Sequence, residues 1–251
     1  MTADGNAITA RDITKRYGGT TAVDGLDLEV PAGVVYGFLG PNGAGKTTTM
    51  RILTGLIEPT SGDGFVDGIH CTERASLVDH IGLLPEEPPL YRELTGREQL
   101  QFAADLRDIP WSEVKQRALE IVDALDLKDD LDRRIDGYSK GMKQKTAFVQ
   151  AIQHDPAVVF LDEPTSGLDP RAAKTLRELI VDLAAGETTV FLSTHILPVV
   201  EEIADRVGVL YDGRLVSEGS PDGLAGASDD GEGDLEDAFL ELTADSSTSW
   251  Q

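Results

Sequence analysis

Cysteine and long apolar segments are the two features that this sequence most clearly lacks. Its 251 residues include a single cysteine, Cys71. An internal disulfide is therefore excluded, and so little cysteine is typical of a protein of the reducing cytosol. No apolar run approaches the roughly 18 to 20 residues that a membrane-spanning helix needs, and the N-terminus has no basic and apolar leader. We therefore expect any association with a membrane to depend on a partner protein.

Basic residues are also scarce. The chain has 22 Lys and Arg against 45 Asp and Glu, and its formal net charge is -23. Binding to a nucleic-acid backbone depends on Lys and Arg, so we expect no nucleic-acid partner. Concentrated salt shortens the Debye length from about 10 Å at 0.1 M to about 3 Å at 1 M, and thereby screens the self-repulsion of an acidic chain. The composition therefore predicts a halophilic source.

Glycine, in contrast, is concentrated where it can bind phosphate. With 40% hydrophobic residues the chain can form one large α/β unit, and residues 40–48 read GPNGAGKTT after an apolar run. Glycines allow positive φ angles and turn backbone N–H groups inward, while a helix that opens at Lys46 adds its positive dipole end. A plain glycine-rich turn is the alternative, but the order of strand, loop and helix favours a nucleotide site. Its expected residues are Gly40, Pro41, Asn42, Gly43, Ala44, Gly45, Lys46, Thr47 and Thr48.

Each polar residue of this loop has an expected contact. Lys46 is predicted to lie between the β- and γ-phosphates, Thr47 to ligate Mg²⁺, and Thr48 to contact the α-phosphate. The apolar run at residues 158–161 reads as a buried parallel strand that ends in Asp162 and Glu163. Ligands of open α/β sheets lie at such strand ends, so Asp162 is predicted to hold hydrated Mg²⁺ and Glu163 to polarise the attacking water. A solvated acidic turn is the alternative.

Between the loop and the acidic strand the sequence reads YSKGMKQK, at residues 138–145. This segment resembles, in variant form, the signature usually written LSGGQ of the ATP-binding cassette (ABC) transporter family. The resemblance to a nucleotide-binding subunit of that family runs from Ile8 to Leu242. It implies an α/β P-loop NTPase fold with a RecA-like core, an antiparallel β subdomain and an inserted helical subdomain. No [NT]-K-x-D guanine-reading motif is present, so adenine is the expected base and ATP the expected nucleotide.

The resemblance also implies boundaries within the chain. We expect an ATPase domain at residues 1–225, with the helical subdomain at about 88–150, where residues such as Val114, Ala118 and Val122 repeat at helical spacing. Residues 226–251 are expected to form an acidic linker, a short helix with Leu235 and Leu242 on one face, and a disordered tail from Thr243. Asp-Gly pairs predict tight hairpins at residues 65–69 and 209–216.

Three residues match family positions that serve a second subunit. Ser139 reads as the N-cap of a helix that runs to about Gln153, and Gly141 follows within the signature. In the family this helix end contacts the γ-phosphate held by another cassette, so the resemblance implies a dimer. Asp169 lies in the segment that resembles the D-loop, which crosses the dimer interface. Ordinary helix capping remains the alternative for Ser139, for Gly141 and for Asp169, which precedes a first-turn proline.

His195 and Tyr17 match two further positions of the family. His195 follows the apolar run 189–192, where the family has a histidine that contacts the γ-phosphate and orients the catalytic glutamate. A structural histidine is the alternative. Tyr17 lies where the family stacks an aromatic ring on adenine, a contact that contributes on the order of 1–3 kcal/mol by analogy with nucleic-acid bases. An edge-strand tyrosine is the alternative.

Glu86 departs from the commonest family pattern, because many members have a glutamine at this position. A carboxylate can still ligate Mg²⁺ through oxygen, but it cannot donate hydrogen bonds as an amide can. The LPEE and YSKGM segments resemble those of exporters with a separate permease. We therefore expect an ATPase at the cytoplasmic face of the cell membrane, held there by an integral membrane permease. A soluble cassette ATPase acting on nucleic acid or a protein assembly is the alternative, and an inactive nucleotide sensor is a third possibility.

Overall fold

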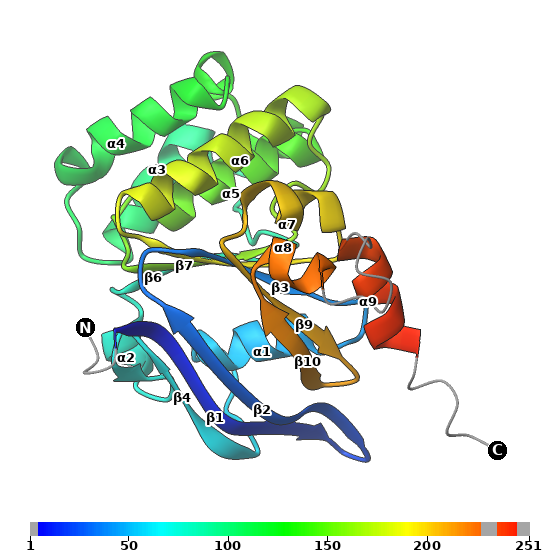
Figure 1. The fold of residues 1–251 in the computed structure, drawn as a ribbon. Helices are drawn as coiled ribbons and strands as arrows, with labels where there is room; N and C mark the ends of the chain where they lie inside the picture. The colour runs from blue at the N-terminus through cyan, green and yellow to red at the C-terminus, as the bar shows by residue number, and fades with distance from the viewer. Residues whose placement is uncertain (1–4, 227–234, 245–251) are drawn as a thin grey trace.

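Two β-sheets share one apolar core in the computed structural model, which describes residues 5–226 and 235–244 (Figure 1). The first sheet is antiparallel, has the order β2-β1-β4-β5, and consists of β1 (Asn6–Tyr17), β2 (Thr20–Pro31), β4 (Ser61–Val66) and β5 (Ile69–His70). The second has the order β10-β9-β3-β8-β7-β6. It consists of β3 (Val35–Leu39), β6 (Ile81–Leu84), β7 (Val158–Asp162), β8 (Thr189–Thr194), β9 (Arg206–Tyr211) and β10 (Arg214–Gly219). All neighbouring strands of this sheet run parallel except β9 and β10, which pair with each other in antiparallel orientation.

Helices α3 to α6 lie together on one side of the six-stranded sheet, at the top of Figure 1, and α1 lies on the other side. The α-helices are α1 (Lys46–Leu53), α2 (Arg74–Leu77), α3 (Gly96–Asp105), α4 (Trp111–Ala124), α5 (Lys140–Ile152), α6 (Pro170–Ala185), α7 (Leu197–Ile203), α8 (Pro221–Ala225) and α9 (Leu235–Ala244). Two 3₁₀ helices, η1 (Lys128–Asp130) and η2 (Ile135–Gly137), precede α5. Among the helices that the structure describes, none has both the length and the apolar character for crossing a bilayer.

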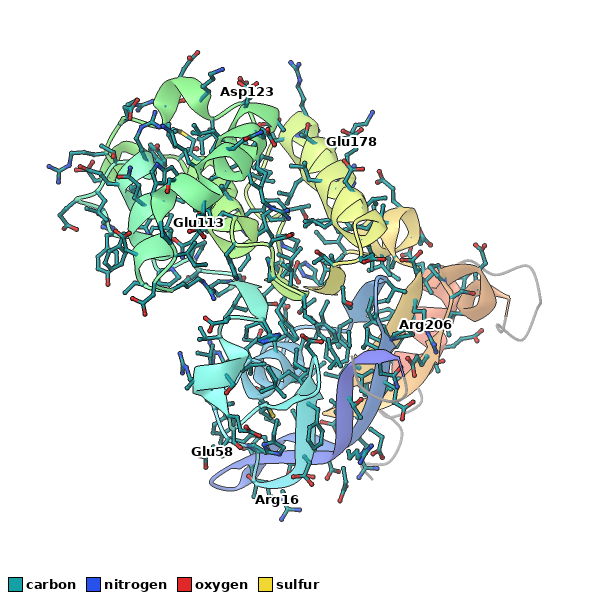
Figure 2. The ribbon with its side chains drawn as sticks, turned by 90° about the vertical axis from the view of Figure 1, so that its left-hand side faces the viewer. Arg16, Glu58, Glu113, Asp123, Glu178 and Arg206 are labelled. Carbon is teal, nitrogen blue, oxygen red and sulfur yellow. The ribbon has the colours of Figure 1, made fainter. Side chains whose placement is uncertain are left out.

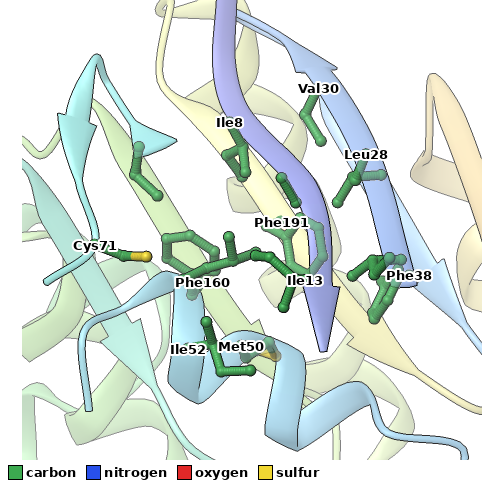
Figure 3. Packing of buried hydrophobic residues seen from close by; sticks show 14 of the residues in the cluster. Ile8, Ile13, Leu28, Val30, Phe38, Met50, Ile52, Cys71, Phe160 and Phe191 are labelled. Atoms are coloured by element: carbon green, nitrogen blue, oxygen red, sulfur yellow. The ribbon is translucent and has the colours of Figure 1, made fainter. Parts of the chain in front are cut away.

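Alternate residues of the central strands feed two different apolar clusters. On β7, Val158 and Phe160 join the cluster between the sheets, whereas Val159 and Leu161 join the cluster under the helices. Figure 3 shows the first cluster, in which α1 packs against the four-stranded sheet and Phe191 of β8. The Phe191 ring centroid lies 5.0 Å from that of Phe38 and 5.5 Å from that of Phe160. Burial on both faces explains why these strands read as continuous apolar runs.

Most expected elements are found at the expected residues. Every residue of β3, β7 and β8 is buried, and Val114, Ala118 and Val122 form the buried face of α4. Both predicted hairpins form, as β4–β5 and β9–β10. Ser139 and Asp169 cap α5 and α6 with their side chains. Local chemistry therefore placed these elements correctly.

The C-terminal prediction needs one correction. Leu235 of α9 belongs to a third cluster that includes Leu224 and Val200, and Leu242 packs against the same cluster. Ala238 of α9 is buried as well. The disordered tail was expected from Thr243, but α9 continues to Ala244, and the Thr243 hydroxyl donates to the Phe239 carbonyl at 2.8 Å. Packing against the core extends the helix by these residues. The expected linker at 227–234 and the tail at 245–251 lie outside the described residues.

Candidate functional site

Two glycines let the phosphate loop pass unusually close to neighbouring backbone. A Cβ atom on Gly40 would lie 2.4 Å from the Leu210 carbonyl oxygen, and one on Gly45 would lie 2.3 Å from the Ala22 carbonyl oxygen. Gly45 also has a φ of 110° and is the N-cap residue of α1. The loop therefore requires glycine at both positions. It leads the chain directly into the first turn of α1, whose free N–H groups favour an anion.

A cavity of about 390 Å³ lies over this loop. The loop forms one wall, and the ends of β7 and β8 form another, because the carboxyl ends of parallel strands meet at one edge of the sheet. The lining residues are Ala22, Asn42, Gly43, Gly45, Lys46, Thr47, Thr48, Glu86, Asp162, Glu163 and His195. The structure thus brings together the loop, both predicted acids, Glu86 and His195.

Lys46 is turned back into the loop. Its Nζ donates to the Gly40 carbonyl oxygen at 2.6 Å and to the Pro41 carbonyl oxygen at 3.2 Å, and the residue is 6% exposed. Burial lowers the pKa of Lys46, whereas Glu163, Asp162 and Glu86 oppose this change because they favour a cation. A cation next to carbonyl oxygens in this cavity is well placed to take phosphate oxygens as alternative acceptors.

Asp162 is held by hydroxyl groups from two other elements. Thr47 Oγ1 of α1 donates to Asp162 Oδ2 at 2.9 Å, and Ser193 Oγ of β8 donates to Asp162 Oδ1 at 2.8 Å. Asp162 as a whole residue is 4% exposed. Thr47 and Asp162 therefore present two neighbouring oxygen atoms, the type of donor atom that Mg²⁺ uses together with phosphate and water. Within the described ranges, no three acidic, His or Cys side chains gather into a metal site of their own.

Glu163 has the most constrained geometry of the site. Its backbone has a φ of 48°, which is rare for a residue with a side chain. Oε2 accepts a hydrogen bond from Thr194 Oγ1 at 3.0 Å, while Oε1 accepts from the His195 backbone N–H at 3.0 Å and lies 2.6 Å from His195 Nδ1. The His195 side chain is 51% exposed. The end of β8 therefore aims the Glu163 carboxylate from two sides.

Sequence reasoning missed the hydroxyls that hold these acids. Ser193 and Thr194 are 0% and 1% exposed, and each donates to one of the two carboxylates. The available signal was a pair of hydroxyl residues at the end of an apolar strand, directly before His195. Their partners lie more than 30 residues away in the sequence, so only the pairing of β7 with β8 reveals the contact. Ala22 of β2 also lines the cavity without a sequence signal.

Seven predicted residues do not line this cavity. Three of them, Gly40, Pro41 and Ala44, belong to the phosphate loop itself, and the other four are Tyr17, Ser139, Gly141 and Asp169. Tyr17 is the last residue of β1 and pairs with Thr20 of β2, whereas the pairing of β1 with β4 ends at Thr14. Its ring is 49% exposed, with Lys15 Nζ 5.2 Å from the centroid. Ser139 Oγ accepts from the Met142 N–H at 3.2 Å, and Asp169 Oδ1 accepts from the Arg171 and Ala172 N–H groups. Gly141 packs against the segment just before Asp169. Within one copy of the chain, Ser139 and Asp169 act as helix caps.

A glycine-rich loop that leads from a parallel strand into a helix, with two held carboxylates opposite, defines the class of P-loop nucleotide-binding proteins. A family model described as "ABC transporter" matches residues 23–166, which is more than half of the chain. The chain therefore belongs to the ABC transporter family.

Known proteins agree with this assignment. The daunorubicin/doxorubicin resistance ATP-binding protein DrrA of Streptomyces peucetius is 40% identical over 215 residues, which cover 85% of this chain and 65% of that protein. A solved ATP-binding subunit of an ABC transporter has a TM-score of 0.88 at 30% identity and covers 94% of this chain and 99% of its own. A dimeric bacterial ABC transporter cassette has a TM-score of 0.79 at 25% identity, with 85% and 98% covered. These structures confirm the predicted cassette fold. The chain spans less than two thirds of the length of DrrA.

Proposed function

We propose that this chain is the ATP-binding and ATP-hydrolysing subunit of an ABC transporter that exports its substrate through a separate membrane permease. The observation that carries the proposal is the Glu163 carboxylate, which Thr194 and His195 aim into the cavity that also contains Lys46. Export is supported by the similarity to DrrA, whose name describes it as a daunorubicin/doxorubicin resistance ATP-binding protein. The proposed location is the cytoplasmic face of the cell membrane, through the permease.

The proposed reaction is attack of water on the γ-phosphorus of ATP. Glu163 takes the proton of the water, the new P–O bond forms, and the bond to the ADP oxygen breaks. Lys46 neutralises charge on the β- and γ-phosphates, Thr48 contacts the α-phosphate, and His195 holds Glu163 and faces the γ-phosphate. Thr47, Asp162 and Glu86 would hold Mg²⁺, which supplies further neutralisation of phosphate charge when bound. The held Thr47–Asp162 pair fits that ion.

We further propose that two copies of the cassette form the working unit. Ser139, Gly141 and Asp169 do not line the cavity of their own chain, and the N-terminus of α5 attracts anions. A second copy would bring this helix end to the γ-phosphate of the first. The related cassette that was solved as a dimer supports this arrangement. Tyr17 is proposed to stack on adenine, since its ring is accessible at the end of β1.

A second cavity is the proposed contact for the permease. It measures about 320 Å³, lies beside α1 and the end of β6, and shares Thr47, Glu86 and Asp162 with the nucleotide cavity. Leu83 and Pro85 line it, as does Leu56, which is 41% exposed. Charged residues line it as well, namely Arg51, Glu86, Glu87 and Asp162, so a permease segment with an apolar face and polar or charged flanks fits this composition. The test is to identify a neighbouring open reading frame that encodes about six apolar spans, as a candidate permease, and to reconstitute its product in vesicles with this chain. ATP-driven transport is expected, and absence of both transport and stimulated turnover would favour the soluble ATPase instead.

Replacing Glu86 by glutamine should change two affinities in opposite directions. A carboxylate attracts Mg²⁺ and repels the triphosphate, whereas an amide does neither as strongly. We expect Glu86→Gln to raise the Mg²⁺ concentration for half-maximal turnover about threefold to tenfold, in line with the loss of one charged ligand. Mg²⁺-free ATP should bind more tightly. Turnover as a function of Mg²⁺ and ATP titration in EDTA measure the two effects.

Glu87→Gln is the matched control for this experiment. Glu87 is as exposed as Glu86 and lines the permease cavity, but it does not line the nucleotide cavity. It should leave both affinities unchanged. If Glu86→Gln alters neither affinity, or shifts both in the same direction as Glu87→Gln, Glu86 does not act on the metal.

The acidic surface supports a proposal about the source of the protein. Asp162 and Glu163 are the only buried acids among the described residues, so the other described acids contact solvent. Figure 2 shows Glu58, Glu113, Asp123 and Glu178 at the outside of the molecule. We propose a halophilic source, in which molar salt screens this charge. The urea midpoint of unfolding should rise from low-salt buffer to molar KCl, with an unchanged m-value. A midpoint that stays constant or falls would contradict the proposal.

The two alternative functions lack a supporting observation. A nucleic-acid backbone is negatively charged and would be repelled by a chain with a net charge of -23. An inactive sensor would have no need for a held carboxylate beside the phosphate loop. Measured ATP turnover separates the sensor from the proposed enzyme.

A further inference from the structure

Lys140 connects the start of α5 to the segment that follows the catalytic turn. It is the first residue of α5 and stands where the signature usually written LSGGQ has a glycine. Its Nζ donates to Ser166 Oγ at 2.9 Å. Ser166 belongs to the segment 166–168, which joins the turn after Glu163 to the cap of α6. A side chain at this signature position thus reaches the segment that resembles the D-loop.

The stem of Lys140 makes the contact broader than one hydrogen bond. A Cβ atom on Gly167 would lie 2.7 Å from Lys140 Cδ and 2.9 Å from Cγ, so the methylene groups cover the Gly167 backbone directly. Beneath them, a Cβ atom on Gly141 would lie 3.0 Å from the Gly167 carbonyl oxygen. The Lys140 side chain therefore lies directly on the Gly167 backbone, and the backbone at Gly141 comes close to the backbone at Gly167. Gly167 has a φ of 77°, a backbone conformation that glycine adopts readily.

The Lys140 ammonium group donates to a neutral hydroxyl, although acidic side chains are abundant in this chain. Acids outnumber bases by 45 to 22, yet in the described part of the chain Lys140 forms no ion pair and donates to the neutral Ser166 hydroxyl. Lys140 itself is exposed, whereas Ser166 is half-buried. Ser166 is also joined to the catalytic turn, because its N–H donates to the Glu163 carbonyl oxygen at 3.0 Å. The Glu163 carbonyl lies 3.4 Å from Gln144 Nε2 of α5 as well.

We propose that Lys140 is a positioning residue that fastens the segment 166–168 to the start of α5, so that the ends capped by Ser139 and Asp169 meet a second copy as one preformed surface. This inference rests on the proposed two-copy site. Ordering the segment in advance reduces the conformational entropy that association must lose. Lys140 acts through Ser166, and not on the nucleotide of its own chain.

The test measures association in the Glu163→Gln background, where ATP is bound without being hydrolysed. Lys140→Met retains the stem and removes the ammonium, Ser166→Ala removes the acceptor, and Lys140→Arg restores a donor. The dimer dissociation constant is measured by sedimentation at saturating Mg-ATP, and ATP affinity is measured on the dilute monomer. Lys174→Met is the control, because it removes the same charge from the outer face of α6, where Lys174 pairs with Glu178.

We expect Lys140→Met and Ser166→Ala each to weaken the dimer about threefold to tenfold, the range of a single hydrogen bond. The double variant should be no weaker than Lys140→Met alone, as residues of one contact are not additive. Lys140→Arg and Lys174→Met should dimerise like the parent, and monomer ATP affinity should stay constant throughout.

Three results would overturn the inference. The first is a dimer that none of the variants weakens. The second is a strong effect of Lys140→Met with a silent Ser166→Ala, which would show a direct charge contact with the other copy. The third is strict additivity in the double variant. A Glu163→Gln parent that stays monomeric with ATP would instead refute the two-copy site itself, and this inference with it.

Discussion

Glu163→Gln is expected to reduce ATP turnover by about 10²- to 10⁴-fold, the range for loss of a general base. The amide cannot take the proton of the attacking water. It has nearly the same shape as the carboxylate, so Lys46 and the phosphate loop remain available for ATP. Nucleotide should therefore bind but stay intact, and hold two copies of the chain together. Phosphate release and sedimentation with and without Mg-ATP measure these two consequences.

Glu113→Gln provides the control for this variant. Glu113 lies exposed in the first turn of α4, so its replacement removes the same charge at a place far from the cavity. It should hydrolyse ATP like the unchanged protein and should not form a persistent dimer. Near-normal turnover in Glu163→Gln would show that Glu163 is not the base, despite its contacts with Thr194 and His195.

Lys46→Ala should act earlier, on nucleotide binding itself. Charge-assisted hydrogen bonds contribute about 1.5–3 kcal/mol, which corresponds to roughly a 10- to 150-fold loss of ATP affinity. The loss should be larger for ATP than for AMP, because the proposed contacts of Lys46 are with the β- and γ-phosphates, which AMP lacks. Calorimetric titration with each nucleotide measures the difference. Turnover at saturating ATP should fall as well, since the same charge stabilises the transferred phosphoryl group.

Folding must be checked in this variant, because Lys46 donates to the Gly40 and Pro41 carbonyl oxygens within the loop. Lys46→Arg retains the charge and should recover part of the affinity in a protein of similar thermal stability. Lys128→Ala, at a side chain that is 71% exposed, is a control for charge alone. An ATP affinity that Lys46→Ala leaves unchanged would refute the role of Lys46.

The parts of the molecule that sequence reasoning predicted are those set by local chemistry. Asp-Gly turns specify the hairpins, Ser139 and Asp169 specify helix starts, and burial of β7 on both faces makes a continuous apolar run. The cavity was predictable for a related reason. A glycine-rich loop and a pair of carboxylates each follow a buried strand, and parallel strands end at one edge.

Contacts between distant strands were not predictable from local patterns. The order β10-β9-β3-β8-β7-β6 pairs Val35–Leu39 with strands that begin at Thr189 and Arg206. No local propensity encodes that pairing, so the Ser193 and Thr194 hydroxyls had no visible partners. Thr243 shows the same limitation at the C-terminus, where packing of α9 on the core extends a helix past the apolar pattern.

The position of β6 gives the nucleotide cavity an asymmetry. Strands β7 and β8 have a neighbour on both sides, whereas β6 is hydrogen-bonded to β7 alone. Asp162 is the last residue of β7, Glu163 follows it, and His195 follows β8, so all three are placed by strands with two neighbours. Glu86 follows β6, which has one neighbour in the described sheet. A mechanical pull on residues 85–87 would therefore be resisted, within the sheet, by the backbone hydrogen bonds between β6 and β7 alone. Asp162 and Glu163 would stay in place, so an external force on this segment would move one negative charge of the cavity and leave the other two acids in position.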